Sequence, residues 1–226
     1  MEKANNYSQI DGKICYIVGA GDPFLPFALK DGDTVIAADG GYDILRAHGM
    51  RADLVIGDFD SSQAAVQDLE GASLVERHPV HKDETDMALS LLRGYEMGYR
   101  RFVLLGGTGG REDHTYANYQ LLLRARHMGA DAVLVGRSQL VRVIENGACQ
   151  LFGKVGETLS VFALNKEALG VTIEGAAYPL TDGTLTADFA LGVSNAFATD
   201  RVRITVRDGA LLVFSPLCDL NKIEFS

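Results

Sequence analysis

The chain has 226 residues, and 47% of them are hydrophobic, which is enough to bury a core in one large domain or two small ones. The formal net charge of −9 argues against a nucleic acid or a membrane surface as partner, because phosphate-rich polymers attract the opposite sign. Three widely spaced cysteines form no C-x-x-C pair, which argues against a disulfide framework or a zinc knuckle and fits a reducing cytoplasm. With a polar N-terminus and no long apolar run, we expect a soluble, unexported, cytoplasmic protein.

The first 135 or so residues alternate short apolar runs with helical patterns. Strands are expected at 13–19, 34–39, 53–58, 101–107 and 131–136, and helices near 42–49, 62–69, 85–98 and 114–128. The apolar runs lack polar alternation, which is typical of strands covered on both faces in a mainly parallel sheet. This half is therefore predicted to be α/β, with helices flanking the sheet.

The pattern changes after about residue 140, where short or alternating runs are separated by Gly, Asn and Asp. The runs on either side of Asp208 and Gly209 predict a tight hairpin, because such a turn needs residues that tolerate positive φ. We expect an antiparallel β-sandwich here. The predicted domains are 1–138 (α/β) and 139–226 (β), with a boundary known only to within several residues.

Polar clusters follow three of the predicted parallel strands. They are "ADGG" at 38–41, "GDFDSS" at 57–62 and "GGTGGREDH" at 106–114. Ligands of open α/β sheets bind beyond the carboxyl ends of the strands, so all three clusters are expected along one edge.

Two acidic pairs predict a metal site at that edge. Asp58 and Asp60 point the same way in an extended segment. Asp83 and Asp86 can share one side of the first turn of a helix, which Thr85 or Asp83 could cap. Mg²⁺ binds one or two carboxylates together with substrate phosphate oxygens. Either pair alone could instead be turn residues and helix caps.

The glycines at 106–110 can make a turn, or let backbone N–H groups approach a phosphate, with Arg111 as a charged donor. The second interpretation is favoured because a turn seldom needs four glycines in five positions. No G-x-x-x-x-G-K-[ST] motif occurs, and neither "GAGDPF" (19–24) nor the loop at 106 matches G-x-G-x-x-G. A P-loop enzyme and a dinucleotide cofactor are therefore not expected.

The motifs "ADGG", "GDFDS", "KDETD", "GGTGGREDH" and "LGVSNAF" (191–197) occur in the order and at about the spacing of the thiamine pyrophosphokinase (thiamine diphosphokinase) family, which the chain resembles over essentially its whole length. The resemblance implies an enzyme that transfers pyrophosphate from ATP to the hydroxyethyl group of thiamine, giving thiamine diphosphate and AMP. It also implies a cytosolic homodimer with active sites at the subunit interface, an ATP- and metal-binding α/β domain and a thiamine-binding β-sandwich.

Site residues follow from the matching positions. The implied Mg²⁺ ligands, which with Arg111 form the catalytic set, are Asp58, Asp60, Asp83 and Asp86. The implied ATP-binding residues are Asp39, Gly40, Gly106, Gly107, Thr108, Gly109, Gly110, Arg111, Asp113 and His114. The implied thiamine-binding residues are Thr85, Asp86, Ser194 and Asn195.

The chain departs from the family at the thiamine side. Many relatives carry an acidic residue where this chain has Ala196, and some use a Trp against thiamine, whereas this chain has none. Stacking would have to come from Tyr178, Phe189 or Phe197, or from no residue. Asp86 is the preferred acceptor of the alcohol proton, and His114 is the rival, although capping a helix is the more expected role for His114.

Other functions remain open at this point. A transferase with an Asp-x-Asp metal site for a nucleotide sugar would share "GDFDS" but would leave "KDETD" and "GGTGGREDH" unexplained. A noncatalytic nucleotide or thiamine sensor would be expected to lose metal ligands, and all four aspartates are present. A plain interaction domain explains the core pattern but not the acidic edge.

Overall fold

A computed structural model of the chain describes residues 12–21, 27–57, 72–77, 84–218 and 223–225. The chain divides into two compact units, Met1–Arg137 and Ser138–Ser226. Within the described ranges, no helix has both the length and the apolar character needed to cross a membrane.

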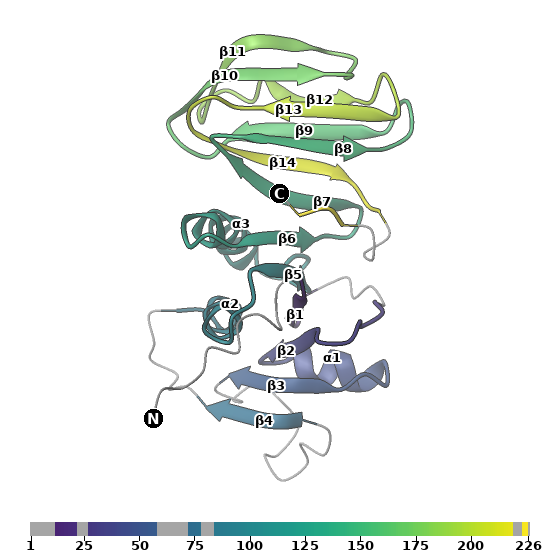
Figure 1. The fold of residues 1–226 in the computed structure, drawn as a ribbon, viewed down its shortest axis with the longest axis vertical. Helices are drawn as coiled ribbons and strands as arrows, with labels where there is room; N and C mark the ends of the chain where they lie inside the picture. The colour runs from purple at the N-terminus through teal and green to yellow at the C-terminus, as the bar shows by residue number, and fades with distance from the viewer. Residues whose placement is uncertain (1–11, 22–26, 58–71, 78–83, 219–222, 226) are drawn as a thin grey trace. The chain divides into compact units, whose positions relative to one another are not determined.

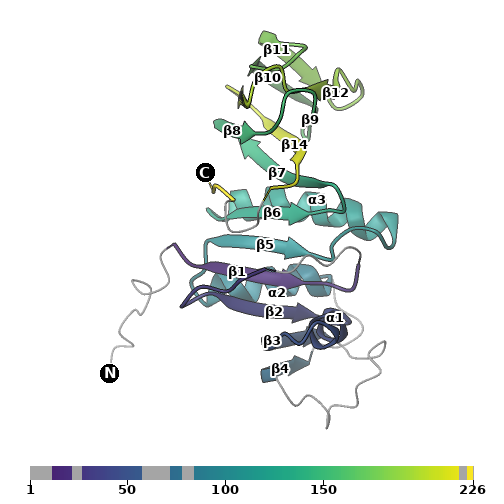
Figure 2. The same ribbon diagram turned by 90° about the vertical axis from the view of Figure 1, so that its right-hand side faces the viewer.

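The described part of the first unit contains six parallel strands, which lie side by side in Figures 1 and 2. They are β1 (Ile14–Val18), β2 (Thr34–Ala38), β3 (Ala52–Gly57), β4 (Ala72–Arg77), β5 (Arg101–Leu105) and β6 (Asp131–Val135). Their order is β6-β5-β1-β2-β3-β4, and every neighbouring pair is parallel. Every residue of β2 and β6 is buried, which explains why these runs show no polar alternation. The expected parallel sheet is confirmed.

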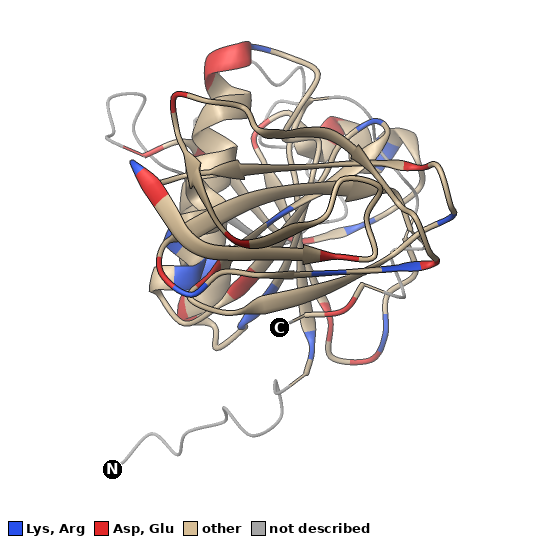
Figure 3. Ribbon diagram, turned by 90° about the horizontal axis from the view of Figure 1, so that it is seen from above, with Lys and Arg blue, Asp and Glu red and all other residues tan. Residues whose placement is uncertain are grey.

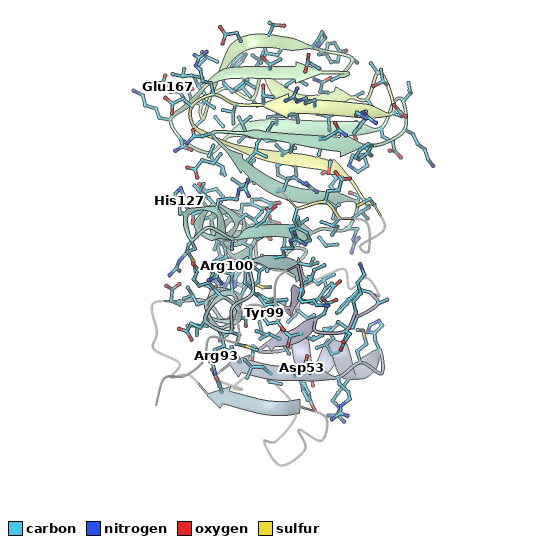
Figure 4. The ribbon with its side chains drawn as sticks, in the orientation of Figure 1. Asp53, Arg93, Tyr99, Arg100, His127 and Glu167 are labelled. Carbon is cyan, nitrogen blue, oxygen red and sulfur yellow. The ribbon has the colours of Figure 1, made fainter. Side chains whose placement is uncertain are left out.

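Three helices cover this sheet within the described ranges: α1 (Gly41–Ala47), α2 (Asp86–Glu96) and α3 (Glu112–His127). The α2 and α3 helices lie on one face and α1 on the other (Figure 1). The Thr85 hydroxyl caps α2 by accepting from the Ala88 N–H at 3.2 Å, as expected. Arg93 of α2, labelled in Figure 4, donates from Nε to Glu76 Oε1 of β4 at 2.9 Å. The helix expected at 62–69 lies outside the described residues.

The β4 strand was not expected from the sequence. Its residues, "ASLVER", mix apolar with small and charged side chains and end in Glu76 and Arg77. The strand lies at the end of the strand order, where one edge has no neighbour among the described strands. An edge strand needs no continuous apolar run, so a search for such runs, which are typical of central strands, does not find it.

The strands of the second unit pair antiparallel in two groups. Its strands are β7 (Gln139–Glu145), β8 (Ala148–Phe152), β9 (Thr158–Ala163), β10 (Glu167–Glu174), β11 (Leu180–Thr186), β12 (Gly192–Ala196), β13 (Arg201–Thr205) and β14 (Ala210–Pro216). One group runs in the order β12-β9-β14-β7 within a longer, mixed sheet, and the other, β11-β10-β13-β8, is a separate four-stranded sheet. Buried side chains from both sheets form one hydrophobic cluster, which includes Leu159, Val171, Phe197, Ile204 and Leu211.

The hairpin expected around Asp208 and Gly209 is wrong. The β13 strand pairs with β8 and β10, whereas β14 pairs with β7 and β9, so the two strands belong to different sheets. The connecting residues bond to other segments: Leu169 N–H donates to Asp208 O at 2.8 Å, and Gly209 N–H donates to Asn146 Oδ1 at 2.9 Å. Gly209, at φ +109, therefore serves a crossing between sheets, which uses the same residue types as a hairpin turn.

Candidate functional site

The strand order places a topological switch point between β1 and β5. The chain leaves β1 toward β2 and leaves β5 toward β6, in opposite directions along the sheet. At such a point the connections diverge to opposite faces and leave a crevice beyond the carboxyl ends of the strands. The sequence has glycines at both of these strand ends, Gly19 to Gly21 after β1 and Gly106 to Gly110 after β5.

A cavity of about 320 Å³ lies at this point in the first unit, at the lower end of the size range of small-molecule sites. Its lining comes from the ends of β1, β2 and β5 and from the starts of α2 and α3. The lining residues are Gly19, Ala20, Gly21, Ala38, Asp39, Thr85, Asp86, Met87, Gly106, Gly107, Thr108, Gly110, Arg111, His114, Thr115 and Asn118.

Glycine is required where the two loops meet. Gly21 N–H donates to Gly106 O at 2.8 Å, so the loops are bonded backbone to backbone. A Cβ on Gly106 would lie 2.2 Å from Gly19 O, and one on Gly21 would lie 2.3 Å from Thr108 O. Gly106 also has φ +64, which disfavours other residues. The cavity wall here is therefore bare backbone, which a phosphate can approach closely.

Two helices begin at the cavity. The α2 helix starts at Asp86 behind its Thr85 cap, and the α3 helix starts at Glu112 behind Arg111, which makes no side-chain capping bond. The first N–H groups of a helix have no partner within it, and the helix dipole places partial positive charge there. Two such ends at one glycine-lined cavity favour an anionic ligand.

Arg111 is held by an exposed ion pair at the mouth of α3. Its Nε donates to Asp113 Oδ1 at 3.1 Å and its Nη2 to Asp113 Oδ2 at 2.5 Å, with the two side chains 73% and 64% exposed. Hydrogen bonding to Arg111 lowers the pKa of the Asp113 carboxyl, and the same bond raises the pKa of the guanidinium. Both groups are therefore charged at neutral pH, and the guanidinium is positioned beside the cavity.

Most described residues of the predicted nucleotide site meet at this cavity. They are Asp39, Gly106, Gly107, Thr108, Gly110, Arg111 and His114, joined by Thr85 and Asp86. Gly40, Gly109 and Asp113 are not part of its lining. His114 lies within the first turn of α3 and is not its N-cap, so the expectation that it caps the helix is wrong.

Three of the four predicted metal ligands, Asp58, Asp60 and Asp83, lie outside the described residues. The fourth, Asp86, lines the cavity together with Asp39, whose φ is +45 and whose N–H donates to Ile56 O at 2.7 Å. In the part of the chain that the structure describes, no three His, Cys, Asp or Glu side chains come close enough to hold a metal ion.

Cavity residues of two kinds were not predicted from the sequence. "GAG" at 19–21 was considered only as a failed dinucleotide motif, although glycines directly after a buried strand signal a bare loop. Met87, Thr115 and Asn118 lie within or beside helical patterns, where the sequence gives no sign of which side faces a ligand.

The predicted thiamine residues of the second unit differ from each other in exposure. Asn195 is buried, and its amide bonds to backbone: Oδ1 accepts from Tyr178 N–H at 2.9 Å and Ala196 N–H at 2.8 Å, and Nδ2 donates to Tyr178 O at 2.7 Å. Ser194 is exposed at φ +56, and its N–H donates to Ser160 Oγ at 3.1 Å.

The three candidate stacking residues also differ in exposure. Phe197 is 1% exposed within the core of the second unit, so its ring has no free face for a ligand. Tyr178 and Phe189 are exposed, as are Leu191 and Val193 near the start of β12, a strand at the end of its sheet order. Positions of both charge signs are interspersed along the ribbon (Figure 3).

An open parallel sheet with a glycine-lined cavity at its switch point is the construction of an α/β protein that binds a phosphate-bearing ligand. The family model of the thiamin pyrophosphokinase catalytic domain matches residues 27–134, and that of the thiamin pyrophosphokinase vitamin B1 binding domain matches 148–211. The chain therefore belongs to the thiamin pyrophosphokinase family, whose enzymes transfer pyrophosphate from ATP to thiamine and release AMP.

Individual relatives agree with this assignment. The thiamine pyrophosphokinase of Bacillus subtilis (strain 168) is 25% identical over 160 residues, which are 70% of this chain and 75% of the relative. The crystal structure of thiamin pyrophosphokinase from Geobacillus thermodenitrificans has 26% identity and a TM-score of 0.77, and the match covers 92% of this chain and 99% of that one. A Bacillus subtilis crystal structure, at 23% identity, shares the fold with a TM-score of 0.80 over 90% of this chain and 98% of its own.

Proposed function

We propose that this chain transfers the terminal pyrophosphate of ATP to the hydroxyethyl group of thiamine, and that the ATP phosphates bind in the cavity between β1 and β5. This location of the ATP phosphates is supported by one observation: two glycine loops and two helix N-termini lie at the same cavity. Membership of the family supplies the reaction.

The chain's own groups suit the bond that must break. Pyrophosphoryl transfer breaks the bond between the β-phosphorus and the oxygen that bridges it to the α-phosphorus. The thiamine hydroxyl oxygen, which loses its proton, forms the new bond to the β-phosphorus, and AMP leaves with the bridging oxygen. Phosphoryl-type transfers depend mainly on positioning and on stabilising negative charge. Backbone N–H groups around Gly106 to Gly110 and the guanidinium of Arg111 supply such charge stabilisation beside the cavity.

The donor set fits a magnesium ion. Asp39 and Asp86 bring two carboxylates to the cavity lining, and carboxylate oxygens are the ligands that Mg²⁺ takes together with phosphate oxygens. We assign Asp86, with Asp58, Asp60 and Asp83, as the residues that would hold it. When bound, the ion neutralises charge on the phosphate oxygens.

Asp86 is also our assignment for the proton acceptor. The thiamine alcohol must lose its proton as its oxygen bonds to phosphorus, and a carboxylate at the start of α2 lines the same cavity as the phosphate-binding loops. His114 is the alternative, since it lines the cavity from the first turn of α3.

The thiamine contacts are proposed on the second unit, with active sites at the interface of a homodimer in the cytoplasm. Ser194 offers an exposed hydroxyl, and Tyr178 and Phe189 offer exposed rings. The apolar side chains Leu191 and Val193 near edge strand β12 support a contact surface for a second copy. Cys15, Cys149 and Cys218 form no disulfide bond in the structure, which is compatible with the reducing compartment.

The test is to incubate purified protein with ATP, Mg²⁺ and thiamine and to identify the products by phosphorus NMR. AMP and thiamine diphosphate in equal amounts are expected, and chelation of Mg²⁺ should stop their formation. ADP with thiamine monophosphate would instead identify an ordinary kinase, and a lack of any thiamine-dependent product would refute the proposed acceptor.

A further inference from the structure

Asn118 is a buried polar residue on an otherwise apolar face of α3. The other buried residues of this helix are Leu121, Leu122 and Ala125, and Asn118 is 6% exposed. Burying an amide is unfavourable unless it forms hydrogen bonds, so packing alone does not explain an asparagine here.

The amide of Asn118 reaches back to the phosphate-binding loop. Its Nδ2 donates to Gly107 O at 2.8 Å, in a contact that is itself buried. A carbonyl oxygen can only accept, so the nitrogen of the amide must face it. A Cβ on Gly107 would come within 3.0 Å of Nδ2, so glycine at this position leaves room for the bond.

This bond fixes the direction of one peptide group in the cavity wall. In a planar trans peptide the C=O and the N–H point in opposite directions. With Gly107 O directed at α3, the N–H of Thr108 is directed away from α3, and Thr108 and Asn118 both line the cavity. Peptides flanked by glycine can rotate at little conformational cost, and this one directly follows Gly107, which is itself preceded by Gly106. Rotation would present an oxygen where an anion needs a donor.

We propose that Asn118 is a positioning residue of the nucleotide site, which holds the Gly107–Thr108 peptide so that the Thr108 N–H serves the phosphates of ATP. This inference rests on the proposed location of ATP in the cavity. It assigns Asn118 no contact with the reacting atoms.

The experiment compares Asn118→Leu, which keeps the side-chain size and removes the donor, with the unaltered protein. Binding of ATP with Mg²⁺ in the absence of thiamine is measured by calorimetry on the full chain. Loss of one buried hydrogen bond predicts a Kd for ATP raised roughly tenfold. The KM for thiamine should stay unchanged. A purely structural role would not produce this difference between the Kd for ATP and the KM for thiamine.

Leu122→Ala is the matched control, because Leu122 is buried on the same helix face and lies outside the cavity lining. It should lower the melting temperature without changing the Kd for ATP. If N118L gives no folded protein, Asn118→Ala removes the same donor with less risk of overpacking.

The outcomes separate the two proposals. A raised Kd in N118L with an unchanged Kd in L122A supports the positioning role. Equal ATP affinity in N118L and the unaltered protein overturns that role and leaves the proposed function intact. Failure of the unaltered protein to bind ATP overturns both.

Discussion

The two units use their polar residues in different ways. In the first unit, parallel strands bring loops from distant parts of the sequence to one edge, where Asp39, Asp86 and Arg111 line a cavity. In the second unit, antiparallel strands reverse direction at each turn, so loops are divided between both ends of the sheets. Asn195, one of the buried polar residues of this unit, bonds to backbone groups of Tyr178 and Ala196.

This difference teaches where substitutions should affect chemistry and where they should affect stability. A polar residue at the carboxyl edge of a parallel sheet lies where a ligand binds, so its substitution is expected to affect ligand binding first. A buried polar residue in an antiparallel unit is expected to hold segments together first. The following variants test this contrast.

The largest effect is expected for Asp86→Asn. Removing the carboxylate while keeping its shape should lower kcat about 100-fold or more, by analogy with other single groups that stabilise transition-state charge. Asp43→Asn is the matched control, since Asp43 is likewise an acid in the first turn of a helix but does not line the cavity. Steady-state rates of AMP formation measure both, and an active D86N would remove Asp86 from the catalytic set.

Two glycine substitutions in one loop distinguish an effect on stability from an effect on ATP binding. Gly106→Ala places a Cβ 2.2 Å from Gly19 O at φ +64 and should cost about 3 kcal/mol of stability. Gly110→Ala meets nothing within 4 Å and should leave the free energy of unfolding within about 0.5 kcal/mol. If phosphates approach this backbone, G110A should still weaken ATP binding several-fold. Urea denaturation and calorimetry together decide, and equal ATP affinity in G110A would place the phosphates elsewhere.

A second pair applies the same contrast to the β unit. Asn195→Ala loses three bonds to backbone and should cost about 3 kcal/mol of stability, with ATP affinity unchanged. Ser194→Ala should leave stability unchanged and raise the KM for thiamine about fivefold, the equivalent of one hydrogen bond. An unchanged KM in S194A would exclude its hydroxyl from the thiamine pocket.

The smallest effect concerns the ion pair of Arg111 and Asp113. Because the pKa of Asp113 is lowered in the folded chain, its contribution to stability is present above the ordinary value of 3.8 and is lost as the pH falls through the lower folded value. Both side chains are exposed, so solvent screens the pair. Asp113→Asn should leave the melting temperature at pH 7 nearly unchanged and should differ from the unaltered protein mainly in how stability declines below pH 4. A large loss at pH 7 would contradict this view.

Local patterns were sufficient for the central strands of the first unit and for its three described helices. The run Val35 to Ala38 is buried throughout, and α2 begins behind Thr85, because burial and capping leave direct marks in the sequence. Edge strand β4 leaves a weaker mark, since one of its sides needs no partner in the sheet.

Non-local relationships were not accessible in this way. The contact between Gly21 and Gly106 depends on β1 and β5 being neighbours, which their separation of some 85 residues does not reveal. The same holds for Asp208 and Gly209, whose turn chemistry suits a hairpin and a sheet crossing equally. The role of Asn195 depends on which backbone groups lie beside it, and a residue's own type does not specify that.

The crossing between β13 and β14 bears on how the second unit is made during synthesis. The last of its strands to leave the ribosome, β14, lies between β7 and β9, so the sheet lacks an interior strand until residues 210–216 have emerged. The six strands of the first unit are all available once residue 135 has been made. The first unit can therefore fold on a growing chain, whereas the second must wait for nearly its whole length, with its apolar strands exposed to chaperones in the meantime.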